Sequence, residues 1–259
     1  MDKKLEGKVA IITGSDSGMG QAMAREFAEH GADVAVTWFE DEQGAQETKR
    51  LVEDAGQKAM VMQTDVRDPS SIASLFQSTE KQLGVPYILV NDAGVDATGK
   101  NVVDMSLEEW EDRIKANLTG PFVACQHFIK ARQGAGGKGK IINITSVHED
   151  IPRAGAAGYC ATKGGLRNLT RCLTLELAPD KINVNNIAPG MILTPMNQPA
   201  LDDPQVLEEQ VQSIPFKRAG EPWEIAKLAL YLASDDSDYA SGQTFTLDGG
   251  LMMNQGQGA

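Results

Sequence analysis

The chain has 259 residues, 41% of them hydrophobic, and a formal net charge of −12 at pH 7. This length allows one large domain with a substantial buried core. Because such an acidic surface repels phosphate backbones and anionic lipid, we expect no nucleic-acid and no membrane partner. The first residues lack an apolar signal segment, and Cys125, Cys160 and Cys172 lack the spacing of metal ligands. We therefore expect a cytoplasmic protein that binds no metal.

Short apolar runs alternate with longer helical patterns along the whole chain. The predicted strands are 8–12, 33–38, 59–63, 87–90, 140–145, 181–187 and 244–247. The predicted helices are 18–30, 42–55, 69–83, 106–132, 158–177 and 222–233. Strands rich in β-branched residues that alternate with helices are typical of a parallel sheet covered on both faces. The pattern predicts an α/β protein with a Rossmann-type, doubly wound parallel sheet of about seven strands, in a single domain spanning 1–259.

The segment from Leu193 to Arg218 interrupts this alternation. It is long for a connection, and its prolines restrict the backbone to a few arrangements. Long insertions of this kind often cover an active site. We expect 193–218 to be a lid that is mobile without ligand and closes over the substrate.

Glycines gather between the first predicted strand and the first predicted helix. Glycine lets the backbone approach a pyrophosphate closely, and the helix N-terminus offers free N–H groups to the same anion. Because the loop stands between a strand and a helix of a doubly wound chain, it predicts a dinucleotide site. The loop residues expected to bind the cofactor are Gly14, Ser15, Asp16, Ser17, Gly18, Met19 and Gly20.

Tyr159 and Lys163 are four residues apart in a predicted helix, so their side chains share one face. An ammonium at that place can favour the phenolate and lower the tyrosine pKa from its usual value of about 10. A phenol tuned in this way can act as a general base towards an alcohol. Ser146 ends a predicted strand, where its hydroxyl could bond the same substrate oxygen.

These motifs together resemble the classical short-chain dehydrogenase/reductase family over essentially the whole chain. The loop spacing Gly-x-x-x-Gly-x-Gly is similar to the nucleotide loop of that family. The run 91–94 is similar to its Asn-Asn-Ala-Gly signature, with Asp92 in place of the second asparagine, and Pro189-Gly190 followed by Thr194 matches the segment that lines the nicotinamide. The resemblance implies an NAD(P)-dependent oxidoreductase that moves a hydride between the nicotinamide and an alcohol or carbonyl substrate.

The resemblance also implies a role for individual residues. Tyr159 would exchange a proton with the substrate oxygen, and Lys163 would lower the Tyr159 pKa and hold the nicotinamide ribose. Ser146 would fix the reacting oxygen, and Asn117 would hold a water in a proton relay. The further cofactor contacts implied are Asp65, Val66, Asn91, Ala93, Gly94, Pro189, Gly190, Ile192 and Thr194. From the sequence alone, Asp65 could equally be a turn or helix-capping residue.

The choice between NAD and NADP depends on the end of the second strand. Trp38 and Phe39 occupy the discriminating positions, and Glu40 and Asp41 follow. An acidic residue here accepts hydrogen bonds from ribose hydroxyls, whereas arginine favours a 2′-phosphate. Because no arginine or lysine is near in the sequence, we expect NAD to be preferred over NADP. Alternatively, the two acidic residues only solvate the loop.

The run Ser146-Val-His148-Glu149 resembles the glucose 1-dehydrogenase branch of the family. It implies an aldose or polyol substrate whose hydroxyls bond to His148 and to Asn197 in the lid, while Ser146 and Tyr159 hold the reacting oxygen. One alternative is a 3-oxoacyl reductase, which an acidic surface disfavours because it repels an acidic carrier protein. Another is a non-catalytic nucleotide sensor, which would be expected to lack the proton donor.

Family members commonly form homotetramers through their two long helices, so the resemblance implies the same assembly here. Both predicted helices carry apolar residues on more than one face. The residues concerned are Phe122, Val123, Phe128, Leu166, Leu169, Leu173 and Leu177. Alternatively, these side chains pack within their own chain.

Overall fold

The computed structural model describes residues 3–254 and contains one parallel sheet of seven strands in the order β3-β2-β1-β4-β5-β6-β7. The strands are β1 (Val9–Thr13), β2 (Asp33–Trp38), β3 (Ala59–Gln63), β4 (Ile88–Asn91), β5 (Gly139–Ile144), β6 (Ile182–Pro189) and β7 (Thr244–Leu247). The order reverses between β1 and β4, which defines the switch point of a doubly wound fold. The predicted fold class is confirmed.

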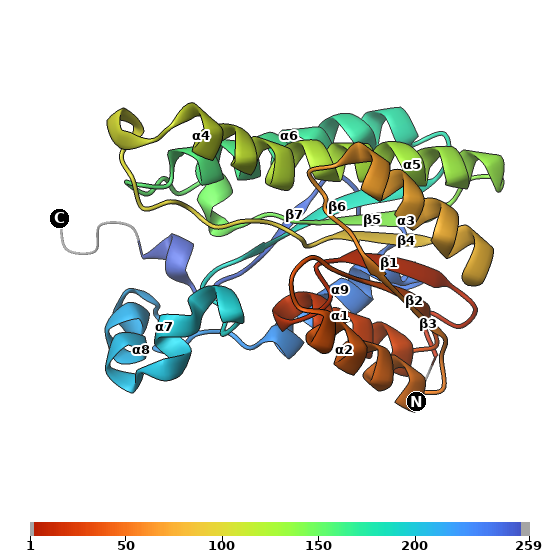
Figure 1. Cartoon of the computed structure of the whole chain (residues 1–259), viewed down its shortest axis with the longest axis horizontal. Coiled ribbons are helices and arrows are strands. Elements are labelled where there is room, and N and C mark those ends of the chain that lie inside the picture. The colour runs from red at the N-terminus through yellow and green to blue at the C-terminus, as the bar shows by residue number, and fades with distance from the viewer. Residues whose placement is uncertain (1–2, 255–259) are drawn as a thin grey trace.

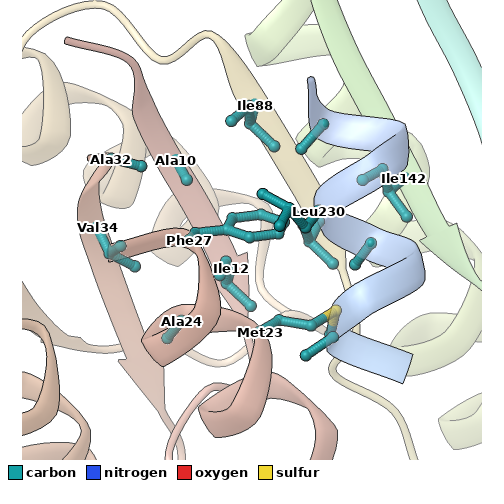
Figure 2. Packing of buried hydrophobic residues seen from close by; sticks show 14 of the residues in the cluster. Ala10, Ile12, Met23, Ala24, Phe27, Ala32, Val34, Ile88, Ile142 and Leu230 are labelled. Atoms are coloured by element: carbon teal, nitrogen blue, oxygen red, sulfur yellow. The ribbon is translucent and has the colours of Figure 1, made fainter. Parts of the chain in front are cut away.

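Helices cover both faces of the sheet (Figure 1). One layer holds α1 (Gly18–Glu29), α2 (Glu42–Asp54) and α9 (Pro222–Ala233). The other holds α3 (Pro69–Gln82), α4 (Leu107–Ile114), α5 (Gly120–Gly134) and α6 (Ala157–Leu177). Each layer encloses its own core against the sheet. Figure 2 shows Phe27 of α1 between strand residues such as Ile12 and Leu230 of α9, all buried.

The helix predicted over 106–132 is interrupted in the middle. Ser106 caps α4 as expected, because its side chain and that of Glu109 each accept the other's backbone N–H. Between α4 and α5, however, Lys115–Thr119 form a turn of π-helix. A π-turn contains one more residue than an α-turn, so it rotates the side chains that follow, and such turns are frequent at functional sites. Helix propensity does not distinguish a π-turn from an α-turn, so the sequence did not predict this interruption.

The lid segment is helical for part of its length, with α7 (Gln198–Asp202) and α8 (Pro204–Gln210) standing apart from the layered body (Figure 1). The segment contributes Val211 and Ile214 to a small apolar cluster, which Ala219 completes. The segment is anchored at its base by a parallel bridge between Ile192 and Gly220.

The apolar residues that suggested an assembly interface are mostly used within the chain. Phe128, Leu166, Leu173 and Leu177 are buried, and Val123 and Leu169 pack against the same core. Only Phe122 of that set stays substantially exposed, at 44%. The alternative explanation, packing within the chain, therefore holds for six of the seven.

Within residues 3–254, no helix is long and apolar enough to cross a membrane, and no group of three or more acidic, histidine or cysteine side chains is arranged to hold a metal. The three cysteines are free: Cys125 is buried, Cys160 is half-buried and Cys172 is exposed.

Candidate active site

The glycine loop is closed so tightly that side chains would not fit. A Cβ on Gly20 would lie 2.1 Å from the carbonyl oxygen of Gly14, and one on Gly14 would lie 2.9 Å from Cα of Ala93. Gly14 also has a φ of +66°, a conformation that disfavours other residues. The loop therefore presents bare backbone at the start of α1, as a pyrophosphate site requires.

Ser15 points away from this site, contrary to its predicted role. Its hydroxyl donates to the Ile12 carbonyl at 2.8 Å and accepts the Thr37 N–H at 2.9 Å, while its own N–H donates to the Thr37 carbonyl. Its hydroxyl and its N–H thus fasten the loop to β1 and β2. The Asn91 side chain is also interior, since it donates to Asn143 Oδ1 on β5 at 2.8 Å. Neither side chain is available to a cofactor.

A cavity of about 310 Å³ lies beside the glycine loop, over the ends of β1, β2, β3 and β4. The carboxyl ends of parallel strands at a switch point are the usual place for a nucleotide. The lining residues are Gly14, Asp16, Thr37, Trp38, Phe39, Glu40, Thr64, Asp65, Val66, Arg67, Ala93, Gly94, Val95 and Ala116. Eight of the predicted cofactor residues are therefore brought together around one pocket, and its size and position fit the adenosine part of a dinucleotide.

Arg67 is the charged residue of this pocket that sequence reasoning missed; Thr37, Thr64, Val95 and Ala116 also line it and were not predicted. Its guanidinium lies 4.6 Å from the centre of the Phe39 ring. It donates to Asp65 at 2.8 Å and to Asp112 at 3.1 Å. The expectation that no basic group is near Phe39 is thus wrong in space, although it is correct along the chain. The available signal was that residues directly after neighbouring parallel strands meet at one edge of the sheet.

Asp65 has the turn role that the sequence had left open. Its carboxylate accepts both the backbone N–H and the side chain of Arg67, at 2.9 and 2.8 Å. The hydrogen bond and charge of Arg67 lower the pKa of Asp65 against the opposing effect of burial. Asp65 also lines the pocket, so it is both a turn residue and a possible nucleotide contact.

Tyr159, Lys163 and Ser146 converge next to this region from α6 and the end of β5. The Lys163 ammonium lies 5.5 Å from the centre of the Tyr159 ring and donates to the Ile144 carbonyl at 2.8 Å. Ser146 is buried, and its hydroxyl is within hydrogen-bonding range of the Tyr159 phenol. The predicted shared helix face is therefore present, with the serine beside it.

The expected lowering of the tyrosine pKa is not found. Burial raises the pKa of Tyr159 to about 12, and the hydrogen bond with Ser146 opposes this rise only in part. Burial also lowers the pKa of Lys163 to about 8, against the negative charges of Asp92, Glu149 and Asp96. Proximity on one helix face does not suffice here, because the ammonium is hydrogen-bonded to Ile144 and both groups have lost solvent.

Asn117 lies in the π-turn and ties it to the loop after β4. Its Oδ1 accepts the Val95 N–H at 2.8 Å, and its Nδ2 donates to the Val95 carbonyl at 2.9 Å. The side chain is 1% exposed. The residue thus holds the 92–95 loop beside Lys163, and its predicted part in a water relay stays a prediction.

The two predicted sugar contacts differ in their surroundings. The His148 ring lies edge-on to Tyr159, with centroids 6.1 Å apart, and its Nδ1 contacts the Ile151 carbonyl at 2.9 Å. This contact orients the ring and leaves Nε2 for a substrate. Asn197 instead donates from Nδ2 to the Ile192 carbonyl at 2.7 Å, so its amide N–H₂ already braces the base of the lid.

A buried acid, Glu149, supports the same loop. Its side chain is 1% exposed and lies 3.3 Å from Nε of Arg167 on α6. Burial raises its pKa, and neither of its carboxylate oxygens makes a hydrogen bond within residues 3–254, so the charge of Arg167 is its main partner. The sequence contained this residue next to His148, but only its place between β5, β7 and α6 shows that it fastens the loop to the helix of Tyr159.

The segment after β6 approaches the glycine loop from the other side. Thr194 is 9% exposed, and a Cβ on Gly18 would lie 3.2 Å from its side chain. Gly190 packs so closely on Asp248 that a Cβ would lie 2.8 Å from it. Pro189 ends β6 and Ile192 is buried beneath the segment. This places 189–194 where a ring attached to the pyrophosphate would continue.

A switch-point nucleotide pocket, together with a half-buried tyrosine and a buried lysine and serine at its edge, defines the class of nicotinamide-dependent oxidoreductases. Residues 14–252 match the family model described as enoyl-(acyl carrier protein) reductase. The chain belongs to the short-chain dehydrogenase/reductase family, and it is an NAD(P)-dependent dehydrogenase acting on CH–OH groups.

Relatives within this family differ in substrate. The chain is 39% identical to 3beta-hydroxysteroid dehydrogenase 1 of Eggerthella lenta, over 97% of this chain and 96% of that protein. It is 35% identical to glucose 1-dehydrogenase 2 of Bacillus subtilis, over 99% of both. The crystal structure of acetoin dehydrogenase from Enterobacter cloacae superposes with a TM-score of 0.89 at 38% identity, covering 97% of this chain and 98% of that one. The family is thereby shown, while its members' substrates span sugars, steroids and acetoin.

Proposed function

We propose that this protein oxidises an aldose or polyol with NAD as the preferred cofactor. The observation that carries the substrate class is the His148 ring, which is oriented by Ile151 and lies edge-on to Tyr159. A histidine fixed beside the proton-transferring phenol offers a hydrogen bond to a hydroxyl near the reacting carbon. The similarity to glucose 1-dehydrogenases supports the same class.

When bound beside 189–194 and Lys163, a nicotinamide would supply the hydride acceptor, and side chains of this protein would transfer the proton. Ser146 orients the substrate oxygen, and Tyr159 accepts its proton. Lys163 holds the nicotinamide ribose and assists the loss of the phenolic proton. Asn117 keeps the 92–95 loop beside Lys163 and takes part in the relay to solvent. Because the Tyr159 pKa is high, the phenol is predominantly protonated near neutral pH, and oxidation should accelerate as the pH rises.

The proposed preference for NAD depends on the acidic and basic side chains of the adenosine pocket. Asp16 and Glu40 line it and would repel a 2′-phosphate, whereas Arg67 would attract one. The Arg67 guanidinium is already paired with Asp65 and Asp112. Its positive charge is therefore largely compensated, which supports a preference for NAD.

We extend the proposal to closure and assembly. The lid would close over the bound sugar, with Asn197 contributing its carbonyl oxygen. A homotetramer in the cytoplasm is supported by exposed apolar side chains along α4, α5 and α6: Leu107 at 71%, Phe122 at 44% and Leu175 at 80% exposure. Apolar residues exposed on adjoining elements are typical of an interface.

A substrate panel tests the proposal. Initial rates with aldoses, polyols, acetoin, a 3β-hydroxysteroid and a β-ketoester would be measured with both NAD and NADP. The proposal expects the highest kcat/KM for an aldose or polyol. A higher value for the steroid, acetoin or the β-ketoester would assign the site to that class instead, and no turnover of any substrate despite nucleotide binding would favour a sensor.

A further inference from the structure

Asp92 is a buried carboxyl group that the proposed mechanism does not use. It follows β4 directly, at the position where the family pattern has asparagine. Its Oδ1 is buried and makes no hydrogen bond within residues 3–254, although the residue as a whole is partly exposed. Replacing asparagine by aspartate exchanges a donor N–H₂ for an oxygen, so an ionised Asp92 offers only acceptors. An unsatisfied buried acceptor of this kind is costly.

The groups around Asp92 connect it to both halves of the site. The backbone N–H groups of Asp92 and Ala93 both donate to Thr13 Oγ1 at 3.1 Å. These bonds hold Asp92 beside Thr13, the last residue of β1. The backbone N–H of Gly20, in the first turn of α1, favours the charged form of the Asp92 carboxyl group and so acts to lower its pKa. The charged groups that act on it are Lys163 from α6 and Asp16 from the glycine loop.

A nucleotide diphosphate at the glycine loop would compete with an ionised Asp92. Both would use the positive end of α1, and like charges in a poorly solvated site disfavour each other. Burial already raises the pKa of Asp92 to about 7, with the charge of Lys163 acting in the opposite direction. Burial also raises the pKa of Asp16. The negative charge of Asp92 beside the start of α1 can therefore be removed by one proton near neutral pH.

We propose that Asp92 takes up a proton when the nucleotide diphosphate binds, so that its carboxyl group, with one oxygen buried and unsatisfied, no longer carries a negative charge. This inference rests on the nucleotide site proposed above. Below neutral pH the carboxyl is already neutral and binding is unimpeded. As the pH rises, binding must first protonate Asp92, so nucleotide affinity falls.

The test compares the wild-type protein with Asp92→Asn, using ADP as the probe. ADP carries the diphosphate but lacks the nicotinamide ribose, so its binding does not depend on the contact proposed for Lys163. Dissociation constants are measured by calorimetry from pH 6 to pH 8.5 at constant ionic strength. Because the ADP phosphate ionises alike for both proteins, that effect cancels in the ratio of wild-type to variant Kd. The ratio should rise about 10-fold over this range.

Calorimetry in buffers of different ionisation enthalpy provides a second readout. At pH 8 the wild-type protein should take up more protons per ADP bound than Asp92→Asn does. Glu40→Gln is the matched control, because it removes an exposed carboxylate from the same pocket and should change the affinity by one factor at every pH. A ratio of wild-type to variant Kd that is constant with pH overturns the Asp92 proposal but not the nucleotide site, because a purely structural effect of the substitution would not vary with pH. Absence of ADP binding to the wild-type protein overturns the nucleotide site as well.

Discussion

The nucleotide pocket and the lid are held in place to very different degrees. The pocket stands on β1, β2 and β3, whose buried side chains join the main cores of the sheet, and Ser15 fastens its loop by three hydrogen bonds. Segment 193–218 is held by a small separate cluster, in which its own Val211 and Ile214 pack with Ala219. A binding site formed before the ligand arrives loses little entropy on binding, whereas a loosely held segment can open and close. We infer that nucleotide binding and substrate closure are separable properties.

The largest expected effect separates chemistry from nucleotide binding. Tyr159→Phe should lower kcat by about 10²- to 10⁴-fold or more, because it removes the proton-transferring phenol. The Kd for NAD should stay nearly unchanged, since the adenosine pocket is built on other elements. Stopped-flow rates and a cofactor titration measure both. Tyr231→Phe on α9 is the control and should retain activity; near-wild-type turnover of Tyr159→Phe would refute the assigned mechanism.

The second prediction concerns the substrate side alone. His148→Ala should reduce kcat/KM for aldoses by about 5- to 150-fold, the equivalent of one lost hydrogen bond to a buried polar group. A small ketone without additional hydroxyls should be little affected. His127→Ala, which removes a ring of α5 stacked on Phe76 of α3, serves as the control. Equal losses on both substrates would show that His148 is structural.

The third prediction tests the electrostatics of the pocket. The wild-type protein should show a higher kcat/KM with NAD than with NADP. Phe39→Arg or Asp16→Arg should shift this ratio towards NADP by about 10-fold or more, because a guanidinium can bond the 2′-phosphate. A wild-type preference for NADP would mean that Arg67 outweighs Asp16 and Glu40, and Arg67→Ala should then reverse it.

The smallest expected effect concerns stability and compares the body of the sheet with the lid segment directly. Ile88→Ala removes a fully buried side chain of β4 and should destabilise the protein by about 2–5 kcal/mol. Ile214→Ala, within the lid segment, should lower the free energy of global unfolding by less, about 1 kcal/mol. The same change should increase hydrogen exchange within 193–218. Chemical denaturation and exchange mass spectrometry measure these effects. An equal loss of global stability in both variants would show that the lid is part of the cooperative core.

Several features of the fold and site were determined by the sequence itself, because local patterns encode them. Alternating strands and helices indicated the doubly wound sheet, and the glycine spacing located the nucleotide loop. The four-residue separation of Tyr159 and Lys163 placed them on one helix face. Each of these signals depends on residues that are close along the chain, so backbone geometry alone gives the result.

Other features were decided only by the tertiary structure. Arg67 meets Phe39 because two neighbouring strands end at the same edge of the sheet, and Ser15 turns inward because β2 supplies its partners. The high pKa of Tyr159 and the unsatisfied Oδ1 of Asp92 arise from burial between elements distant in sequence. Desolvation and long-range contacts depend on how all the layers pack, and short sequence patterns do not contain that information.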